Sequence, residues 1–160
     1  MSQTERVLHV IDDESDKAGQ VKIAFATGDR EHVDQHFGSA RSFLIYALDE
    51  DLHHLVEVVE FKPTAGGHDD GKLQPKFKAL EGCAAVHFIA CGPPAIRQLL
   101  NMGVQPVKVE EGSDIHGLLD AARTELNEVP DSWLAKTLAK KRSDKADELA
   151  RLVNMLDEEW

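Results

Sequence analysis

Several common sequence features are scarce here, and cysteine is the first of them. The chain has two cysteines, Cys83 and Cys91, which is too few for a framework of disulfides. If the apolar segment 84–90 between them forms a strand, the two thiols lie roughly 26 Å apart at about 3.3 Å per residue. That distance excludes a disulfide between them and a single metal ion shared by both.

Long apolar runs and basic residues are also scarce. No run approaches the roughly 20 apolar residues that a membrane-spanning helix needs, and segment 7–11 is too short for the core of a signal peptide. The chain has 18 Lys and Arg against 29 Asp and Glu, for a net charge of -11. Binding to a nucleic-acid backbone needs a basic face. We therefore expect a cytoplasmic protein whose partners are neither membranes nor nucleic acids.

The motifs of several enzyme classes are missing. The sequence contains no Gly-x-Gly-x-x-Gly, no Gly-Lys-Ser/Thr phosphate loop, no Gly-x-Ser-x-Gly elbow and no Cys-x-x-Cys pair,. A two-metal nuclease would carry carboxylates on its central strands, and segments 21–26 and 84–90 have none. We expect a protein that is not an enzyme.

Runs of apolar and β-branched residues predict five strands, at 21–27, 42–48, 52–61, 84–90 and 104–109, with Pro106 favouring a sheet edge for the last,. Apolar residues at helical spacing predict helices at 72–80, 95–102 and 114–127. The first three strands form a meander, and the later ones form right-handed parallel crossovers. This order predicts an α/β fold with a mixed five-stranded sheet flanked by helices.

The two ends of the chain differ from this central region. Residues 1–20 are predicted to be an N-terminal tail, although segment 7–11 could form a short strand, and residues 21–128 form the α/β domain. Residues 129–160 form a helical extension with two apolar stripes, Trp133, Leu134 and Leu138, then Leu149, Leu152, Val153, Leu156 and Trp160. Two interpretations stay open: a helical hairpin or pair docked on the core, or a helix that binds a partner.

The loop 33–40, directly after the first buried strand, is the main candidate site. It carries His36, with Phe37 and Gly38 allowing the close approach of a ligand. If strands 21–27 and 84–90 are parallel neighbours, their carboxyl ends meet at one sheet edge, and Cys91 lies near His36. Cys91 also precedes a helix, which favours a thiolate. An imidazole and a thiolate suit iron–sulfur chemistry better than a hard cation.

Less specific interpretations of these residues stay open. His36 could be a surface residue that tethers the loop, and Cys91 a small buried apolar residue. Arg41 and Arg30 could add local positive charge or be ordinary surface residues. His68, in a glycine-rich loop, is a secondary candidate.

Three segments carry a resemblance to a known family: 33–43, with Asp-Gln-His-Phe-Gly at its centre, 81–86 and 97–109. Over roughly residues 7–138 the chain resembles the dinitrogenase iron-molybdenum cofactor-binding domain family. The resemblance implies a ribonuclease-H-like fold and places the family's ligand histidine on His36. The expected cofactor-binding residues are His36, which is also the metal ligand, with Gln35, Phe37, Gly38, Arg41 and Cys91. Of these, Cys91 rests on the sheet geometry alone.

The function that the resemblance implies is a non-catalytic carrier. Its cargo would be an iron–sulfur cluster precursor of the iron-molybdenum cofactor, bound transiently. Its partners would be nitrogenase cofactor assembly proteins, a cluster-building enzyme as donor and a scaffold as acceptor. The alternative is an interaction module that holds an apo assembly protein through the C-terminal helices without binding the cluster. A ribonuclease-H-like hydrolase is disfavoured by the acidic charge and the missing strand carboxylates.

Overall fold

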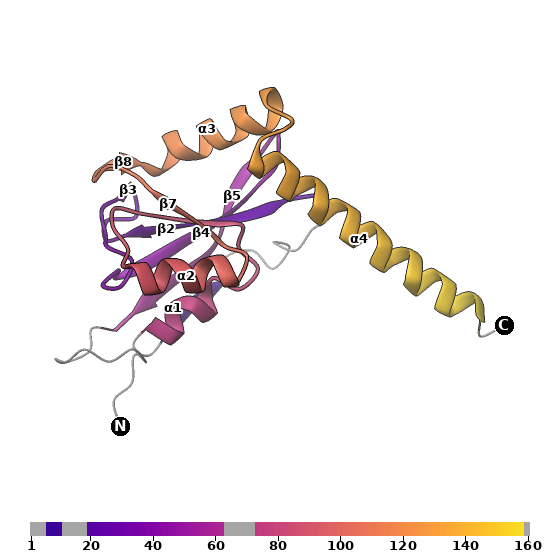
Figure 1. Cartoon of the computed structure of the whole chain (residues 1–160), viewed down its shortest axis with the longest axis horizontal. Helices are drawn as coiled ribbons and strands as arrows, with labels where there is room; N and C mark the ends of the chain where they lie inside the picture. Colours follow the sequence, from indigo (N-terminus) through magenta and orange to yellow (C-terminus); the bar gives the residue numbers. More distant parts are fainter. Residues whose placement is uncertain (1–5, 11–18, 63–72, 159–160) are drawn as a thin grey trace.

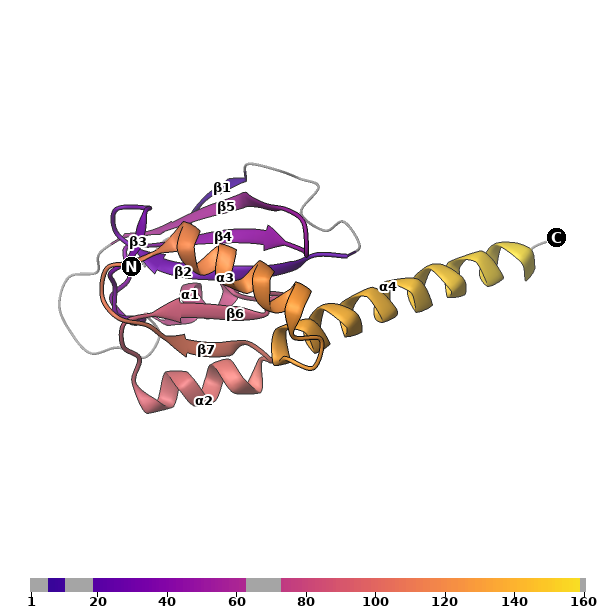
Figure 2. The ribbon, with the colours of Figure 1, turned by 90° about the horizontal axis from the view of Figure 1, so that it is seen from above.

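The computed structural model describes residues 6–10, 19–62 and 73–158. Six strands form one sheet in the order β1-β5-β4-β2-β6-β7. They are β1 (Arg6–Val10), β2 (Val21–Thr27), β4 (Ser42–Leu48), β5 (His53–Phe61), β6 (Ala85–Phe88) and β7 (Gln105–Lys108). Helices α1 (Gln74–Ala79) and α2 (Pro93–Asn101) cover one face of this sheet, and α3 (Ile115–Glu128) lies over the other (Figures 1 and 2). The α/β prediction is confirmed.

The strand pairing follows the predicted meander and crossovers. β2 pairs antiparallel with β4 and parallel with β6, and β4 pairs antiparallel with β5. Every residue of β4 is buried, because helices pack on both faces of the sheet. Along β2 the side chains alternate: Ile23 and Phe25 belong to the core under α3, whereas Ala24 and Ala26 belong to the core under α1 and α2,.

The sheet has six strands, one more than the sequence predicts. Arg6–Val10, inside the predicted N-terminal tail, forms β1 and pairs antiparallel with β5, with Arg6 opposite Phe61 and Val10 opposite Glu57. The acidic residues that follow this segment in the sequence favour a solvated arm over a strand,. The edge of β5, about fifty positions further along the chain, supplies the backbone hydrogen bonds of β1,. A pattern in the local sequence cannot indicate a partner at such a distance.

Two further details differ from the predictions. β6 ends at Phe88 and not at residue 90, because the next two residues pair with the loop after β2. Two short strands, β3 (His32–Val33) and β8 (Ser113–Asp114), form a separate two-stranded sheet that the sequence did not predict. β7 lies at the edge of the main sheet, as Pro106 indicated.

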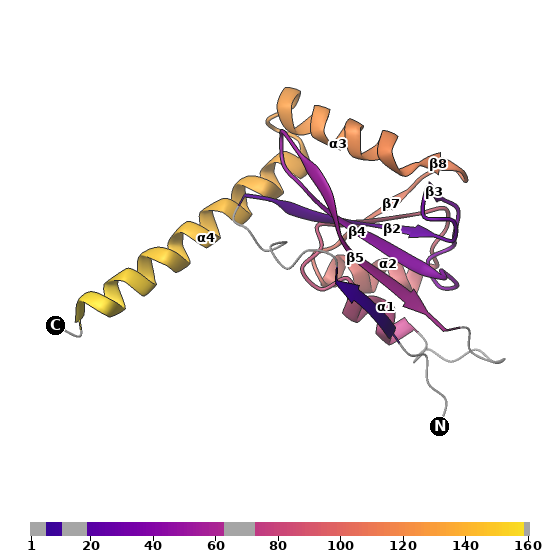
Figure 3. The ribbon, with the colours of Figure 1, turned by 180° about the vertical axis from the view of Figure 1, so that it is seen from behind.

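The C-terminal extension is one continuous helix, α4 (Trp133–Glu158), so the interpretation as a hairpin is wrong. Its first turns dock through Leu134 and Leu138, which are buried in the same core as α3. Arg142 then pairs with Glu50 at 2.7 Å. Beyond this point the helix projects away from the sheet (Figures 1 and 3). Among the described residues, no helix is both long and apolar enough to cross a membrane.

Candidate functional site

The candidate loop is hydrogen-bonded to the chain that leaves β6. The backbone amide of Phe37 donates to the carbonyl of Ala90 at 2.8 Å, and the amide of Ile89 donates to the carbonyl of Gln35 at 3.1 Å. His36 and Ala90 form an isolated parallel bridge between these bonds. The loop therefore extends the pairing of β2 and β6 past the ends of both strands, and its backbone is fixed.

Phe37 anchors this loop in the core. Its side chain is fully buried, and its ring centroid lies 5.7 Å from Phe43, 5.5 Å from Phe77 and 6.2 Å from Phe88. These rings come from β4, α1 and β6. A buried aromatic residue fixes the direction of its neighbours, so His36 and Gly38 on either side of it face outward. Phe37 is thus a positioning residue, although we expected it to contact the ligand.

His36 lies exposed at an open cavity beside Cys91. The cavity has a volume of about 470 Å³ and is lined by His36, Gly38, Ser39, Ala90, Cys91 and Gly92. The parallel pairing of β2 with β6 brings these two segments together, as the sequence predicted. The carboxyl ends of parallel strands are the usual place for a ligand in an α/β sheet. Of the six predicted binding residues, the structure brings His36, Gly38 and Cys91 to the cavity.

The predicted thiolate at Cys91 is wrong. Partial burial raises the pKa of the Cys91 thiol to about 11, so the group is protonated near neutral pH. The following helix gives little compensation, because its first two residues are Pro93 and Pro94, which have no N–H to offer,. The Sγ atom instead contacts the carbonyl of Gly92 at 3.6 Å. A bound metal would have to displace the thiol proton before Cys91 could act as a ligand.

Gln35 and Arg41 lie outside the cavity lining. The Gln35 side chain forms hydrogen bonds with neighbouring residues of the chain. Its Oε1 accepts from the amide of Arg41 at 3.3 Å, and its Nε2 donates to Oδ1 of Asp34 at 3.1 Å. The same Asp34 oxygen accepts from the amide of Gly28 at 2.8 Å. Gln35 therefore holds the two ends of the loop together, and the Arg41 side chain is exposed nearby.

The other candidates do not join this site. Arg30 pairs with Glu60 at 2.9 Å. His32 Nδ1 lies 2.7 Å from Oδ2 of Asp29, and this hydrogen bond raises the pKa of His32. The amide of Glu31 and the His32 ring lower the pKa of Asp29 well below its usual range. His68 lies outside the described residues.

The cavity offers few metal ligands. Within the described part of the chain, no group of three or more His, Cys, Asp or Glu side chains is placed to hold a metal ion. His36 supplies an imidazole nitrogen and Cys91 a sulfur, both from the rim of an open cavity. Such an arrangement suits a group that brings most of its own ligands and binds through one or two protein atoms.

Comparison with known proteins identifies the family. Residues 19–125 match the family model described as dinitrogenase iron-molybdenum cofactor. The chain is 44% identical to Protein NifX of Azotobacter vinelandii over 160 residues, which is 100% of this chain and 99% of that protein. It is 34% identical to Protein NifX of Klebsiella pneumoniae over 141 residues, covering 88% of this chain and 84% of that one. Protein NifY of Klebsiella pneumoniae is 30% identical over 119 residues, covering 74% of this chain and 51% of that protein. The chain belongs to the dinitrogenase iron-molybdenum cofactor family.

Proposed function

We propose that this protein takes part in assembly of the nitrogenase iron-molybdenum cofactor as a non-catalytic carrier. It accepts an iron–sulfur precursor from a cluster-building enzyme, holds it through His36, and passes it to the scaffold that completes the cofactor. Membership of the family supports the assignment to cofactor assembly. The observation that carries the proposal is the exposed His36 imidazole at a cavity that Cys91 also lines.

The geometry supports reversible binding. A cluster held by four protein ligands in a closed cage would leave slowly, whereas His36 stands at the rim of an open cavity. The buried Phe37 and the bond from its amide to Ala90 hold the backbone of His36 in place before the cluster arrives,. Arg41, which is exposed next to this loop, adds a positive charge that favours an anionic cluster.

We also propose that the fold is ribonuclease-H-like and that residues 21–128 form the cluster-binding unit. The three antiparallel strands followed by two parallel crossovers support this assignment. The added β1 lies at the outer edge beyond β5 and leaves that order intact.

Anaerobic titration of the purified protein with isolated cluster precursor tests the role of His36. We expect His36→Ala to bind at least about tenfold more weakly, since one metal–imidazole bond is lost. His32→Ala is the matched control, because His32 lies four positions away and is bonded to Asp29 outside the cavity. Equal affinity of His36→Ala and the parent protein would overturn the assignment to His36.

A second function, an interaction module that holds an apo assembly protein, is favoured by the projecting part of α4. Its large apolar residues are from 50% to 64% exposed: Leu149, Leu152, Val153, Met155 and Leu156. Clustered exposed apolar side chains mark interaction surfaces. If this is the only function, anaerobic incubation with precursor gives the protein no cluster absorbance, but the protein still binds an apo assembly protein. The Leu152→Asp variant then loses that binding.

A further inference from the structure

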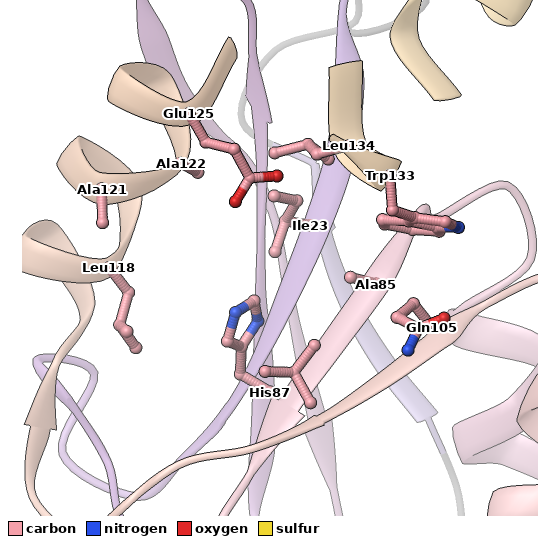
Figure 4. Close-up of a pocket in the computed structure, with 11 residues that line it drawn as sticks. Ile23, Ala85, His87, Gln105, Leu118, Ala121, Ala122, Glu125, Trp133 and Leu134 are labelled. Atoms are coloured by element: carbon pink, nitrogen blue, oxygen red, sulfur yellow. The ribbon is translucent and has the colours of Figure 1, made fainter. Parts of the chain in front are cut away.

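A second cavity lies on the face of the sheet that α3 covers, under α3 and the start of α4. Its volume is about 220 Å³. Most of the residues that line it are apolar, and they include Ile23, Ala85, Val107, Leu118 and Leu134 (Figure 4). Pockets for drug-sized ligands measure roughly 300–1,000 Å³, so this one is sized for a single ring with a short chain. None of its residues lines the His36 cavity.

A neutral histidine forms part of the floor of this cavity. His87 rises from β6 between Leu118 and Ile23 (Figure 4), and its ring stacks on Phe25 with centroids 4.7 Å apart. Burial lowers the pKa of His87 to about 4, so the ring is uncharged near neutral pH. Its Nδ1 lies 3.4 Å from the carbonyl of Ala24, which places the proton on that nitrogen. Nε2 is then a hydrogen-bond acceptor without a partner among the described residues.

A carboxylate shares the same space. Glu125 points from α3 toward the His87 ring (Figure 4), and no hydrogen bond or ion pair joins its carboxylate to another described residue. Trp133 also lines the cavity and is 44% exposed. None of the lining residues, all within the described part of the chain, is a lysine or an arginine. The cavity therefore combines an apolar wall, the Trp133 ring, and two hydrogen-bond acceptors that have no partner among the described residues: the Glu125 carboxylate and Nε2 of His87.

From this combination we propose that the cavity is a binding site for a small organic cation, a primary ammonium group carried on a ring-sized apolar body. The ammonium donates to the Glu125 carboxylate and to Nε2 of His87. The apolar body fills the space among Ile23, Leu118 and Leu134. This site has the opposite charge preference to the His36 cavity and does not depend on the carrier function.

A series of ligands that differ only in their head group tests the charge preference. The probes are 2-phenylethylammonium, the neutral 2-phenylethanol and the anionic 3-phenylpropionate, titrated into the full-length protein by calorimetry at neutral pH. We expect the ammonium compound to bind at least about tenfold more tightly than the alcohol, because its hydrogen bonds are charge-assisted. Equal or tighter binding of the alcohol or the carboxylate, or no heat from the ammonium compound at millimolar concentration, would overturn the proposal.

Two substitutions on α3 locate the binding. Glu125→Gln keeps the shape of the side chain and removes its charge, and we expect roughly tenfold weaker binding of 2-phenylethylammonium. Glu128→Gln, an exposed position on the same helix outside this cavity, is the matched control and should leave the affinity unchanged. If both variants bind as the parent does, the ligand does not contact Glu125 and the assignment fails. The ligand series, measured on the unaltered protein, decides the charge preference if Glu125→Gln does not fold.

Discussion

His36 and Ala90 lie side by side as a parallel bridge, although 54 positions separate them in the chain. The hydrogen bonds of this bridge come from backbone atoms, so the imidazole of His36 is left free at the cavity. The same bridge fixes the start of the segment that carries Cys91. One short contact thus sets the positions of His36 and Cys91 relative to each other.

Replacement of the anchor beneath this bridge should destabilise the protein. Phe37→Ala removes a fully buried ring that contacts three other phenylalanines. We expect a loss of about 3–5 kcal/mol in the free energy of unfolding, the usual cost of a buried Phe→Ala change. Urea denaturation measures it. His36→Ala, at the exposed neighbouring position, should change the midpoint little, and a similar loss in both variants would show that Phe37 is not the anchor.

The side chain of Gln35 should affect binding indirectly. Gln35→Ala removes the hydrogen bonds to Arg41 and Asp34, at a cost of about 1 kcal/mol in stability. With the two ends of the loop less constrained, we expect cluster affinity to fall several-fold, by less than for His36→Ala. Anaerobic titration gives both affinities. A loss equal to that of His36→Ala would instead indicate that Gln35 contacts the cluster.

The sequence predicts most of the sheet, and three of its six candidate binding residues line the cavity. Runs of apolar and β-branched residues at 21–27 and 42–48 identify these strands from the local sequence. The parallel pairing of β2 with β6 is a condition of the predicted site, and the structure confirms it. The sequence does not show that β1 pairs with β5, since the partner lies far along the chain. It also does not show the protonation of Cys91, because this depends on how deeply the thiol is buried and on the absent N–H groups of two prolines.

The reactivity of Cys91 should follow its raised pKa. Alkylation requires the thiolate, and the pKa of about 11 leaves very little thiolate at neutral pH. We expect the rate of reaction with iodoacetamide to be slow at about pH 7 and to rise roughly tenfold per pH unit. Mass spectrometry follows the modification, and Cys91→Ser provides the blank. Cys83 is buried, and burial raises its pKa to about 12, so it should stay unmodified in the folded protein. Rapid labelling of Cys91 at neutral pH would contradict the protonated thiol.

The buried His87 should make the protein less stable in mild acid. Its pKa is about 4 in the folded state against 6.5 for a solvated histidine. Between these values the unfolded chain binds more protons than the folded one, so the free energy of unfolding falls as the pH falls from about 6.5 toward 4. This linkage predicts a loss of about 2 kcal/mol between about pH 7.5 and pH 5 from this residue. Urea denaturation at the two pH values measures it, with His87→Phe, which keeps a ring against Phe25, as the control. His87→Phe should lose about 2 kcal/mol less than the parent over that interval, and equal losses in the two proteins would show that His87 is not the titrating group.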